Sequence, residues 1–176
     1  LPQSLGYWPA VATYFAASIY TLTDLAPDDP ERLAKVVTGY WVFTFVMCGL
    51  FGRDWLRRGE GLSVFLTLLA DLAPLRWRPF STVFPGQTLL GRTSTGFSLA
   101  VFCIAALAAG SFDGLNETFW WMGKIGINPL EFPGRSAVIW PNRLGLTLAI
   151  LALSGVFALA VLIGLALIGQ ARAFHR

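Results

Sequence analysis

The chain has 176 residues, of which 55% are hydrophobic and 13% are charged, and its mean hydropathy is +0.61. These values exclude an ordinary soluble domain and predict an integral membrane protein. The net charge of +3 comes without a lysine-rich run or a basic strip interleaved with aromatic residues, so we expect no nucleic-acid partner.

Four apolar runs have about the length that a membrane-spanning helix needs, which is roughly 20 mostly apolar residues. The first run opens with Tyr7 and Trp8, an aromatic pair typical of the membrane interface. Asp29, Pro30 and Glu31 are expected to start the second helix, because proline and acidic residues favour a first turn. The four predicted spans are residues 7–25, 33–52, 96–113 and 144–169.

A further apolar stretch, GEGLSVFLTLLADLAPL at residues 59–75, is too short to cross a membrane and carries an acid inside it. If it is helical, its polar residues form one stripe, with a second acid one turn before. We therefore expect a short interfacial or re-entrant helix over residues 62–73, ended by Pro74, with its leucine and phenylalanine side chains toward lipid. The stripe consists of Ser63, Thr67 and Asp71, and the acid one turn before it is Glu60.

The predicted fold class is all-α: one transmembrane domain over residues 1–176, a polytopic helix bundle with about four spans and the short helix. Arginine placement predicts its orientation, because short cytoplasmic loops carry an excess of lysine and arginine. This bias places both chain ends in the cytoplasm. The arginines concerned are Arg53, Arg57, Arg58, Arg76, Arg78 and Arg92 between the second and third spans, and Arg172 and Arg176 in the tail. We expect anionic lipid headgroups to bind along the region from Arg53 to Arg78.

Reactive groups are few. The only histidine, His175, is next to the last residue, so we predict no catalytic residue, no metal site and no cofactor. Asp71 is the most unusual acid, because a carboxylate in an apolar segment is costly unless it is paired or hydrated. It is either an ion or proton relay or, as we favour, half of a salt bridge with Arg57, Arg58 or Arg76.

A second candidate is FDGLNETFWW at residues 112–121. Asp113 and Gly114 predict a turn at the end of the third span, and Glu117 is expected in the first turn of a new helix. The Asp113 and Glu117 carboxylates either bind a cation or a substrate amine, or belong to a capped turn beside an aromatic anchor. The expected interface anchors are Trp8, Trp120, Trp121 and Trp140, and the acids Asp28, Asp29 and Glu31 either hold calcium or simply face water.

Several strings in this order resemble a family of bacterial polytopic inner-membrane proteins labelled fenitrothion hydrolase: GYWPAVATYFAASIYTL, DDPERLA, FGRDWLRRGEGLSVFLTLLADLAP and SFDGLNETFW. The resemblance implies a bacterial inner membrane, a longer protein with further spans before the first one here, and hydrolysis of an organophosphate. The chain departs from the family pattern at Asp71 and in NETF after FDG. The matching residues are Asp28, Asp29, Arg53, Arg58, Glu60, Asp113 and Gly114.

The residues themselves favour a helical membrane component without its own catalysis, an accessory or scaffold subunit of a larger assembly. Small residues in the last span, Gly155 with Ala158 and Gly164 with Ala160, let another helix approach closely. Protein partners or further N-terminal segments of the same protein would then cover the bundle. The alternatives are a transport or channel component for a small solute or ion, and the hydrolase that the resemblance implies.

Overall fold

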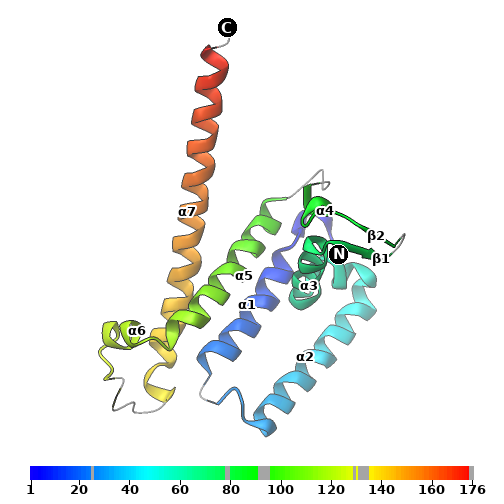
Figure 1. The fold of residues 1–176 in the computed structure, drawn as a ribbon. Coiled ribbons are helices and arrows are strands. Elements are labelled where there is room, and N and C mark those ends of the chain that lie inside the picture. The colour runs from blue at the N-terminus through cyan, green and yellow to red at the C-terminus, as the bar shows by residue number, and fades with distance from the viewer. Residues whose placement is uncertain (25, 78–79, 91–95, 129, 131–134, 175–176) are drawn as a thin grey trace. The chain divides into compact units, whose positions relative to one another are not determined.

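The structure is a computed structural model that describes residues 1–176 except 25, 78–79, 91–95, 129, 131–134 and 175–176. The chain is almost entirely helical, which confirms the all-α prediction (Figure 1). The one strand pair among the described residues is the antiparallel hairpin β1 (Leu75–Trp77) and β2 (Phe80–Thr82), with Leu75 opposite Thr82. The helices are α1 Trp8–Thr23, α2 Pro30–Phe51, α3 Gly61–Leu72, α4 Gln87–Leu90, α5 Phe97–Asn116, α6 Phe119–Lys124 and α7 Ile139–Phe174, with short helical turns Gln3–Leu5, Trp55–Gly59 and Arg135–Ala137.

Three helices of the described chain are long and apolar enough to cross a membrane: α2, α5 and residues Ile139–Gly164 of α7. The first predicted span corresponds to α1, which has only 16 residues. At 1.5 Å per residue it is about 24 Å long, less than the hydrocarbon thickness of about 30 Å. Length and composition therefore identify three spans where four were predicted.

Two helices extend beyond the predicted spans. α5 continues through Asp113 and Gly114 to Asn116, so no turn lies at these residues. The cause is packing, because Phe112 and Asn116, one turn apart, are both buried and make the end of the helix part of a core. α7 begins at Ile139, ahead of the predicted residue 144, and the proline in its first turn is tolerated because that position needs no N–H donor.

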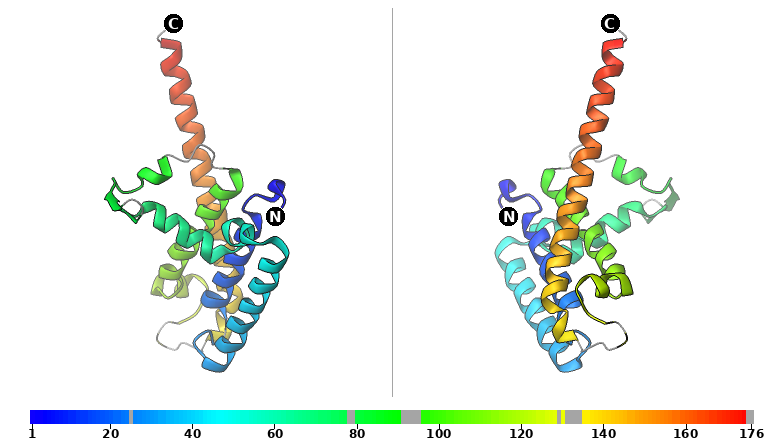
Figure 2. Two further views of the ribbon diagram at one scale, coloured as in Figure 1. Left: turned by 90° about the vertical axis from the view of Figure 1, so that its right-hand side faces the viewer. Right: turned by 90° about the vertical axis from the view of Figure 1, so that its left-hand side faces the viewer.

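The contacts divide the chain into two compact units, Leu1–Ala106 and Leu107–Arg176, and α5 contributes to both. In the first unit α1 and α2 run in opposite directions, joined by a tight turn (Figures 1 and 2).

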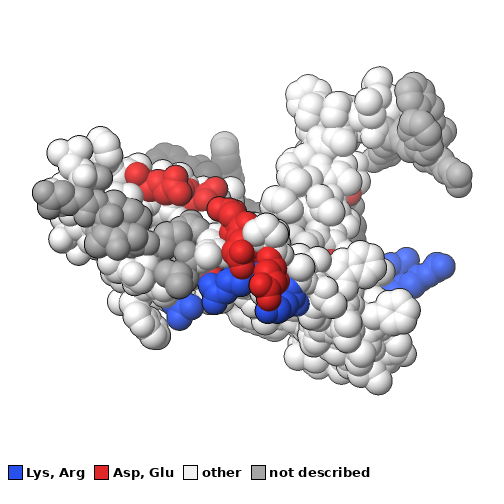
Figure 3. All heavy atoms as spheres, turned by 90° about the horizontal axis from the view of Figure 1, so that it is seen from below, with Lys and Arg blue, Asp and Glu red and all other residues white. Residues whose placement is uncertain are grey.

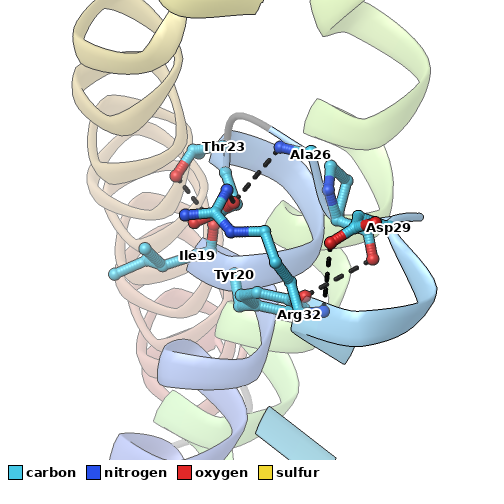
Figure 4. A network of polar contacts seen from close by, with 8 residues as sticks. Ile19, Tyr20, Thr23, Ala26, Asp29 and Arg32 are labelled. Atoms are coloured by element: carbon cyan, nitrogen blue, oxygen red, sulfur yellow. Dashed lines mark hydrogen bonds and ion pairs between the residues drawn. The ribbon is translucent and has the colours of Figure 1, made fainter. Parts of the chain in front are cut away.

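Hydrogen bonds and ion pairs of acidic side chains hold the turn between α1 and α2 (Figure 4). Asp29 caps α2 by accepting a hydrogen bond from the Arg32 backbone N–H at 3.1 Å, and the Arg32 guanidinium pairs with Asp24 at 3.0 Å. Lys35 pairs with Glu31 at 2.6 Å. Seen from below, acidic side chains form a band with basic side chains beside it (Figure 3). The predicted helix start at Asp29 is confirmed, and Asp29 and Glu31, considered for calcium, serve a cap and an ion pair.

The core of the first unit lies where α3 crosses α1 and the first part of α5. Ala10, Val64, Leu99 and Phe102 are buried there. Gly61 makes the crossing possible, because a Cβ atom at this position would lie 2.7 Å from the Tyr14 backbone nitrogen and 2.9 Å from the Ala10 carbonyl oxygen.

The lipid-facing orientation predicted for α3 holds for only part of its apolar surface. Phe65 and Leu68 pack against this core. The other leucines of the helix are exposed: Leu62, Leu66, Leu69 and Leu72. α3 ends at Leu72, just before Pro74, as predicted. It is therefore a core helix with one open face.

The second unit has its own core around Gly145 of α7. A Cβ atom at Gly145 would lie 2.5 Å from the Phe112 ring and 2.6 Å from the Trp121 ring. The two rings meet edge to face with their centres 5.4 Å apart. The Trp121 indole N–H donates a hydrogen bond of 2.8 Å to the Asn142 side-chain oxygen, which connects α6 to α7. The core of the second unit is therefore formed by two aromatic rings that pack against Gly145.

Candidate functional site: a buried glutamate at a helix break

The chain reverses direction between α2 and α3. Gly52 ends α2 with a φ angle of 61°, which favours glycine, and residues Trp55–Gly59 then form one turn of π-helix. Trp55 is 2% exposed, and its ring centre lies 5.6 Å from that of Phe43 and 6.4 Å from that of Phe51. Because Phe43 belongs to the middle of α2, the π-helical turn folds back along α2.

Glu60 lies between the π-helical turn and α3, where the chain completes this reversal. Its backbone is extended, with φ −97° and ψ 117°, so it interrupts the helical path before α3 begins at Gly61. Its carboxylate accepts hydrogen bonds from the backbone N–H groups of Leu62, at 2.9 Å, and Ser63. The side chain thereby caps α3, where the helix dipole favours a negative charge. Glu60 is only 4% exposed. It is thus a buried acid that begins a helix.

Thr13 of α1 holds the backbone on both sides of Glu60. Its hydroxyl lies 3.2 Å from the Gly59 carbonyl oxygen, to which it can donate, and it accepts a hydrogen bond of 2.9 Å from the Gly61 N–H. The close approach of Gly61 to α1 brings these groups within reach. Thr13 and Gly61 together therefore keep the Glu60 side chain in one place.

A cavity of about 360 Å³ separates Glu60 from α2. Tyr40, Thr44 and Cys48 line it from α2, and their spacing of four residues places them on one helix face. The hydroxyl oxygens of Tyr40 and Thr44 are buried and have no hydrogen-bond partner among the described residues. A buried hydroxyl without a partner is costly, so these two groups are suited to a ligand in the cavity. Trp41, Phe45, Leu56, Leu62 and Ser63 complete the lining.

The depth of this cavity is given by its position along α2. At 1.5 Å per residue, Thr44 is about 10 Å and Tyr40 about 16 Å from the C-terminal residue of the helix. The whole helix has 22 residues and a length of about 33 Å. The cavity that Glu60 lines therefore extends from near the C-terminal end of α2, at Cys48, to near the middle of this candidate membrane span, at Tyr40.

The cavity offers the chemistry of a small cation site. It combines one carboxylate with hydroxyl oxygens, which are ligands for hard cations. A single negative charge is balanced by a monovalent cation or a proton, whereas divalent cations in proteins usually take several carboxylates. Among the residues that the structure describes, no group of three or more His, Cys, Asp or Glu side chains is arranged to hold a metal ion.

Of the three arginines predicted to pair with Asp71, Arg57 and Arg58 do not pair with it, and the side chain of Arg76 lies outside the described part of the structure. Arg58 pairs with Asp54 at 3.0 Å, four residues before it, and not with Asp71. Arg57 is exposed and forms no ion pair with a described residue. Asp71 itself is half-buried near the end of α3. Glu60, predicted one turn before the polar stripe, caps the start of the helix. The structure therefore separates the two acids by the length of α3.

The two acids of the second candidate pair, Asp113 and Glu117, are both exposed. Asp113 lies within α5, and Glu117 lies just before α6. Thr118 caps α6 by accepting a hydrogen bond of 3.2 Å from the Trp121 N–H, so the prediction that Glu117 lies in the first turn of that helix is wrong. A threonine hydroxyl is short enough to reach these N–H groups and is a preferred cap. The two carboxylates form no hydrogen bond or ion pair with any other residue in the described part of the chain.

The four tryptophans predicted as interface anchors fall into two groups. Trp8, Trp120 and Trp140 are exposed, and the last two stack with cations, Trp120 with Lys124 at 5.8 Å and Trp140 with Arg143 at 5.2 Å. Trp121 is instead part of the core of the second unit. His175 lies outside the described residues.

Tyr40 and Thr44 are the site residues that the sequence did not lead us to predict. The sequence does contain a signal for them, because two hydroxyl side chains four residues apart in the middle of an apolar span form a short polar stripe.

A comparison of the chain with protein-family models, characterised proteins and solved structures finds no match.

Proposed function

We propose that the chain is a membrane-embedded component of a transport system for a small monovalent cation, with Glu60 as the residue that binds the cation. The observation that supports this is the buried Glu60 carboxylate, which shares a cavity near the middle of α2 with the unpartnered hydroxyls of Tyr40 and Thr44. An ionisable side chain at such a depth is expensive and usually marks an ion pathway. Interrupted helices whose ends border the binding site are a recurrent feature of transporters.

The proposed location is the bacterial inner membrane, with the arginine-rich segment between α2 and α5 and the C-terminal end of this chain in the cytoplasm. Both chain ends would lie there only if α1 also crossed the membrane, as the four-span prediction assumed. The arginine bias of the loops and the resemblance to inner-membrane proteins support it. In this orientation the C-terminal end of α2 and the π-helical turn lie on the cytoplasmic side, so a cation reaches Glu60 from the cytoplasm.

Glu60→Gln is expected to lower cation flux by at least about tenfold, because the charge that binds the cation is lost while the amide oxygen still accepts one of the two capping hydrogen bonds. The full-length protein is reconstituted in proteoliposomes, and fluorescent indicators inside the vesicles report H⁺ and Na⁺ entry driven by an imposed gradient.

Glu117→Gln is the matched control, since it makes the same chemical change at an exposed acid, and it should leave the flux unchanged. Wild-type flux in the Glu60→Gln protein, or equal losses in the two variants, would count against the proposal.

An accessory or scaffold subunit is the second candidate function. It is favoured by the surface of α2, which little of the described chain covers. Within the described part of the chain, none of the residues of α2 is buried. No atom of the described residues lies within 4 Å of the position that a Cβ atom would take at Gly39, and the same holds for Gly155 and Gly164 of α7. Such open small-residue positions accept a neighbouring helix. Disulfide cross-linking of Gly39→Cys to a partner protein in native membranes would support this role, and a protein that is monomeric in gentle detergent would oppose it.

A further inference from the structure

A second and larger cavity, of about 760 Å³, borders the outer part of α3. Its polar lining comes from the residue just before α1, the segment around the π-helical turn, and α3: Tyr7, Asp54, Arg57, Arg58, Ser63 and Thr67. Tyr7 immediately precedes the exposed Trp8 at the start of α1, so the cavity lies toward the end of the α1–α2 pair and not at its middle. This is the region in which the candidate span α2 would meet the headgroup layer.

The charges around this cavity do not cancel. Arg58 is engaged with Asp54 at 3.0 Å, which neutralises both groups. Arg57 forms no ion pair with a described residue, and its side chain is exposed beside the cavity. The two guanidinium groups and the one carboxylate therefore leave a single positive charge on the lining, and this charge favours an anionic ligand.

Hydrogen-bond donors are available next to that charge. Ser63 is in the first turn of α3 and Thr67 is one turn later on the same face. The Thr67 hydroxyl donates to the Ser63 carbonyl oxygen at 2.6 Å, whereas the Ser63 hydroxyl forms no hydrogen bond with another described residue. A guanidinium fork beside a serine hydroxyl is a usual combination for binding phosphate oxygens.

The remaining lining is aliphatic. Leu56, Leu68 and Leu99 face the cavity together with Val64. A soluble phosphate would leave this surface uncovered, whereas a phospholipid has a charged phosphate and an apolar glycerol ester and acyl region on the same molecule. The combination of one uncompensated arginine with an aliphatic wall therefore matches a phospholipid better than a free anion.

We propose that this cavity binds an anionic membrane phospholipid. The phosphate oxygens bind at Arg57 and the Ser63 hydroxyl, and the glycerol ester and first acyl carbons lie along Leu56 and Leu68. Leu56 and Ser63 line both cavities, but the two sites differ in chemistry, because the lining charge here is positive and the ligand is an anion. The sequence predicts that anionic headgroups bind along the region from Arg53 to Arg78, and this proposal places one of them at Arg57.

The test is native mass spectrometry of the full-length protein released from nanodiscs that contain phosphatidylglycerol or phosphatidylcholine, with the apparent dissociation constant of the retained lipid as the readout. Arg57→Gln is expected to weaken phosphatidylglycerol binding by about fivefold, which corresponds to about 1 kcal/mol for one interfacial cation. Arg53→Gln removes the same charge from an exposed position outside the cavity lining and should change the affinity by less than about twofold.

Further measurements separate the possible ligands. Leu56→Asn should weaken lipid binding, and inorganic phosphate at millimolar concentration should not displace the lipid. Displacement by phosphate would overturn the lipid assignment in favour of a soluble phosphate. Equal losses in Arg57→Gln and Arg53→Gln, or a loss in neither, would show that the lipid is held by general surface attraction and would overturn the site. Glu60→Gln should retain the lipid, so this result is independent of the transport assay.

Discussion

Gly61→Ala is expected to lower the free energy of unfolding by about 2–3 kcal/mol. The added Cβ atom would lie 2.7 Å from the Tyr14 backbone nitrogen and 2.9 Å from the Ala10 carbonyl oxygen. Both are backbone atoms of α1, and Ala10 is completely buried, so the contact can be relieved only by moving one helix away from the other. That movement would also lengthen the hydrogen bond from the Gly61 N–H to Thr13. The measurement is reversible unfolding of the protein in mixed micelles, followed by far-ultraviolet circular dichroism.

Gly39→Ala is the matched control for this change. Gly39 is inside α2, and no atom of the described residues lies within 4 Å of the place that its added methyl group would occupy. Alanine is a better helix former than glycine by about 0.5–1 kcal/mol, so this variant should be as stable as the wild type or slightly more stable. If Gly61→Ala were as stable as Gly39→Ala, α3 could not cross α1 as closely as described.

Gly145→Ala is expected to destabilise the second unit by about 2 kcal/mol. Its Cβ atom would lie 2.5 Å from the Phe112 ring and 2.6 Å from the Trp121 ring. Aromatic rings are rigid, and Phe112 is only 1% exposed, so its ring has little room to turn aside. The hydrogen bond between Trp121 and Asn142 should weaken as well. Near-ultraviolet circular dichroism during thermal unfolding reports the packing of these rings.

Gly155→Ala is the corresponding control on the same helix. A Cβ atom at Gly155 would have no neighbour within 4 Å among the described residues. The substitution should therefore be neutral or slightly stabilising in the isolated protein. A loss of tryptophan packing in both α7 variants, or in neither, would contradict the assignment of Gly145 to an aromatic contact.

Local chemistry made parts of the fold predictable. The start of α2 could be predicted because Asp29 and the proline after it satisfy the first turn without help from other segments. The end of α3 could be predicted because Pro74 disfavours helix at the residue before it. Such signals act within a few residues, so they can be recognised from the sequence alone.

Features that depend on distant contacts were missed. Asp113 and Gly114 suggested a turn, but the burial of Phe112 and Asn116 continues α5 past them. Phe65 was expected to face lipid, yet it packs against Tyr14 of α1 with the ring centres 5.5 Å apart. These outcomes depend on which helix lies beside each face, and periodicity cannot supply that information.

The candidate site shows the same limit. Glu60 could be singled out as an acid next to an apolar stretch, but its role as a buried cap could not be foreseen. Glutamate is not among the preferred capping residues, and its cavity partners Tyr40 and Thr44 come from another helix. Only the reversal of the chain at the π-helical turn brings these groups to one cavity.

The capping role of Glu60 links two equilibria. The carboxylate that would hold the cation also accepts hydrogen bonds from the Leu62 and Ser63 N–H groups. The same two oxygen atoms would therefore cap α3 and bind the cation. Any change in the charge of that carboxylate therefore changes the free energy of the first turn of α3, and by reciprocity the order of this turn changes the affinity for the cation. Hydrogen exchange at the Leu62 and Ser63 amides would then report occupancy of the cavity directly, in a protein whose ligand absorbs no light.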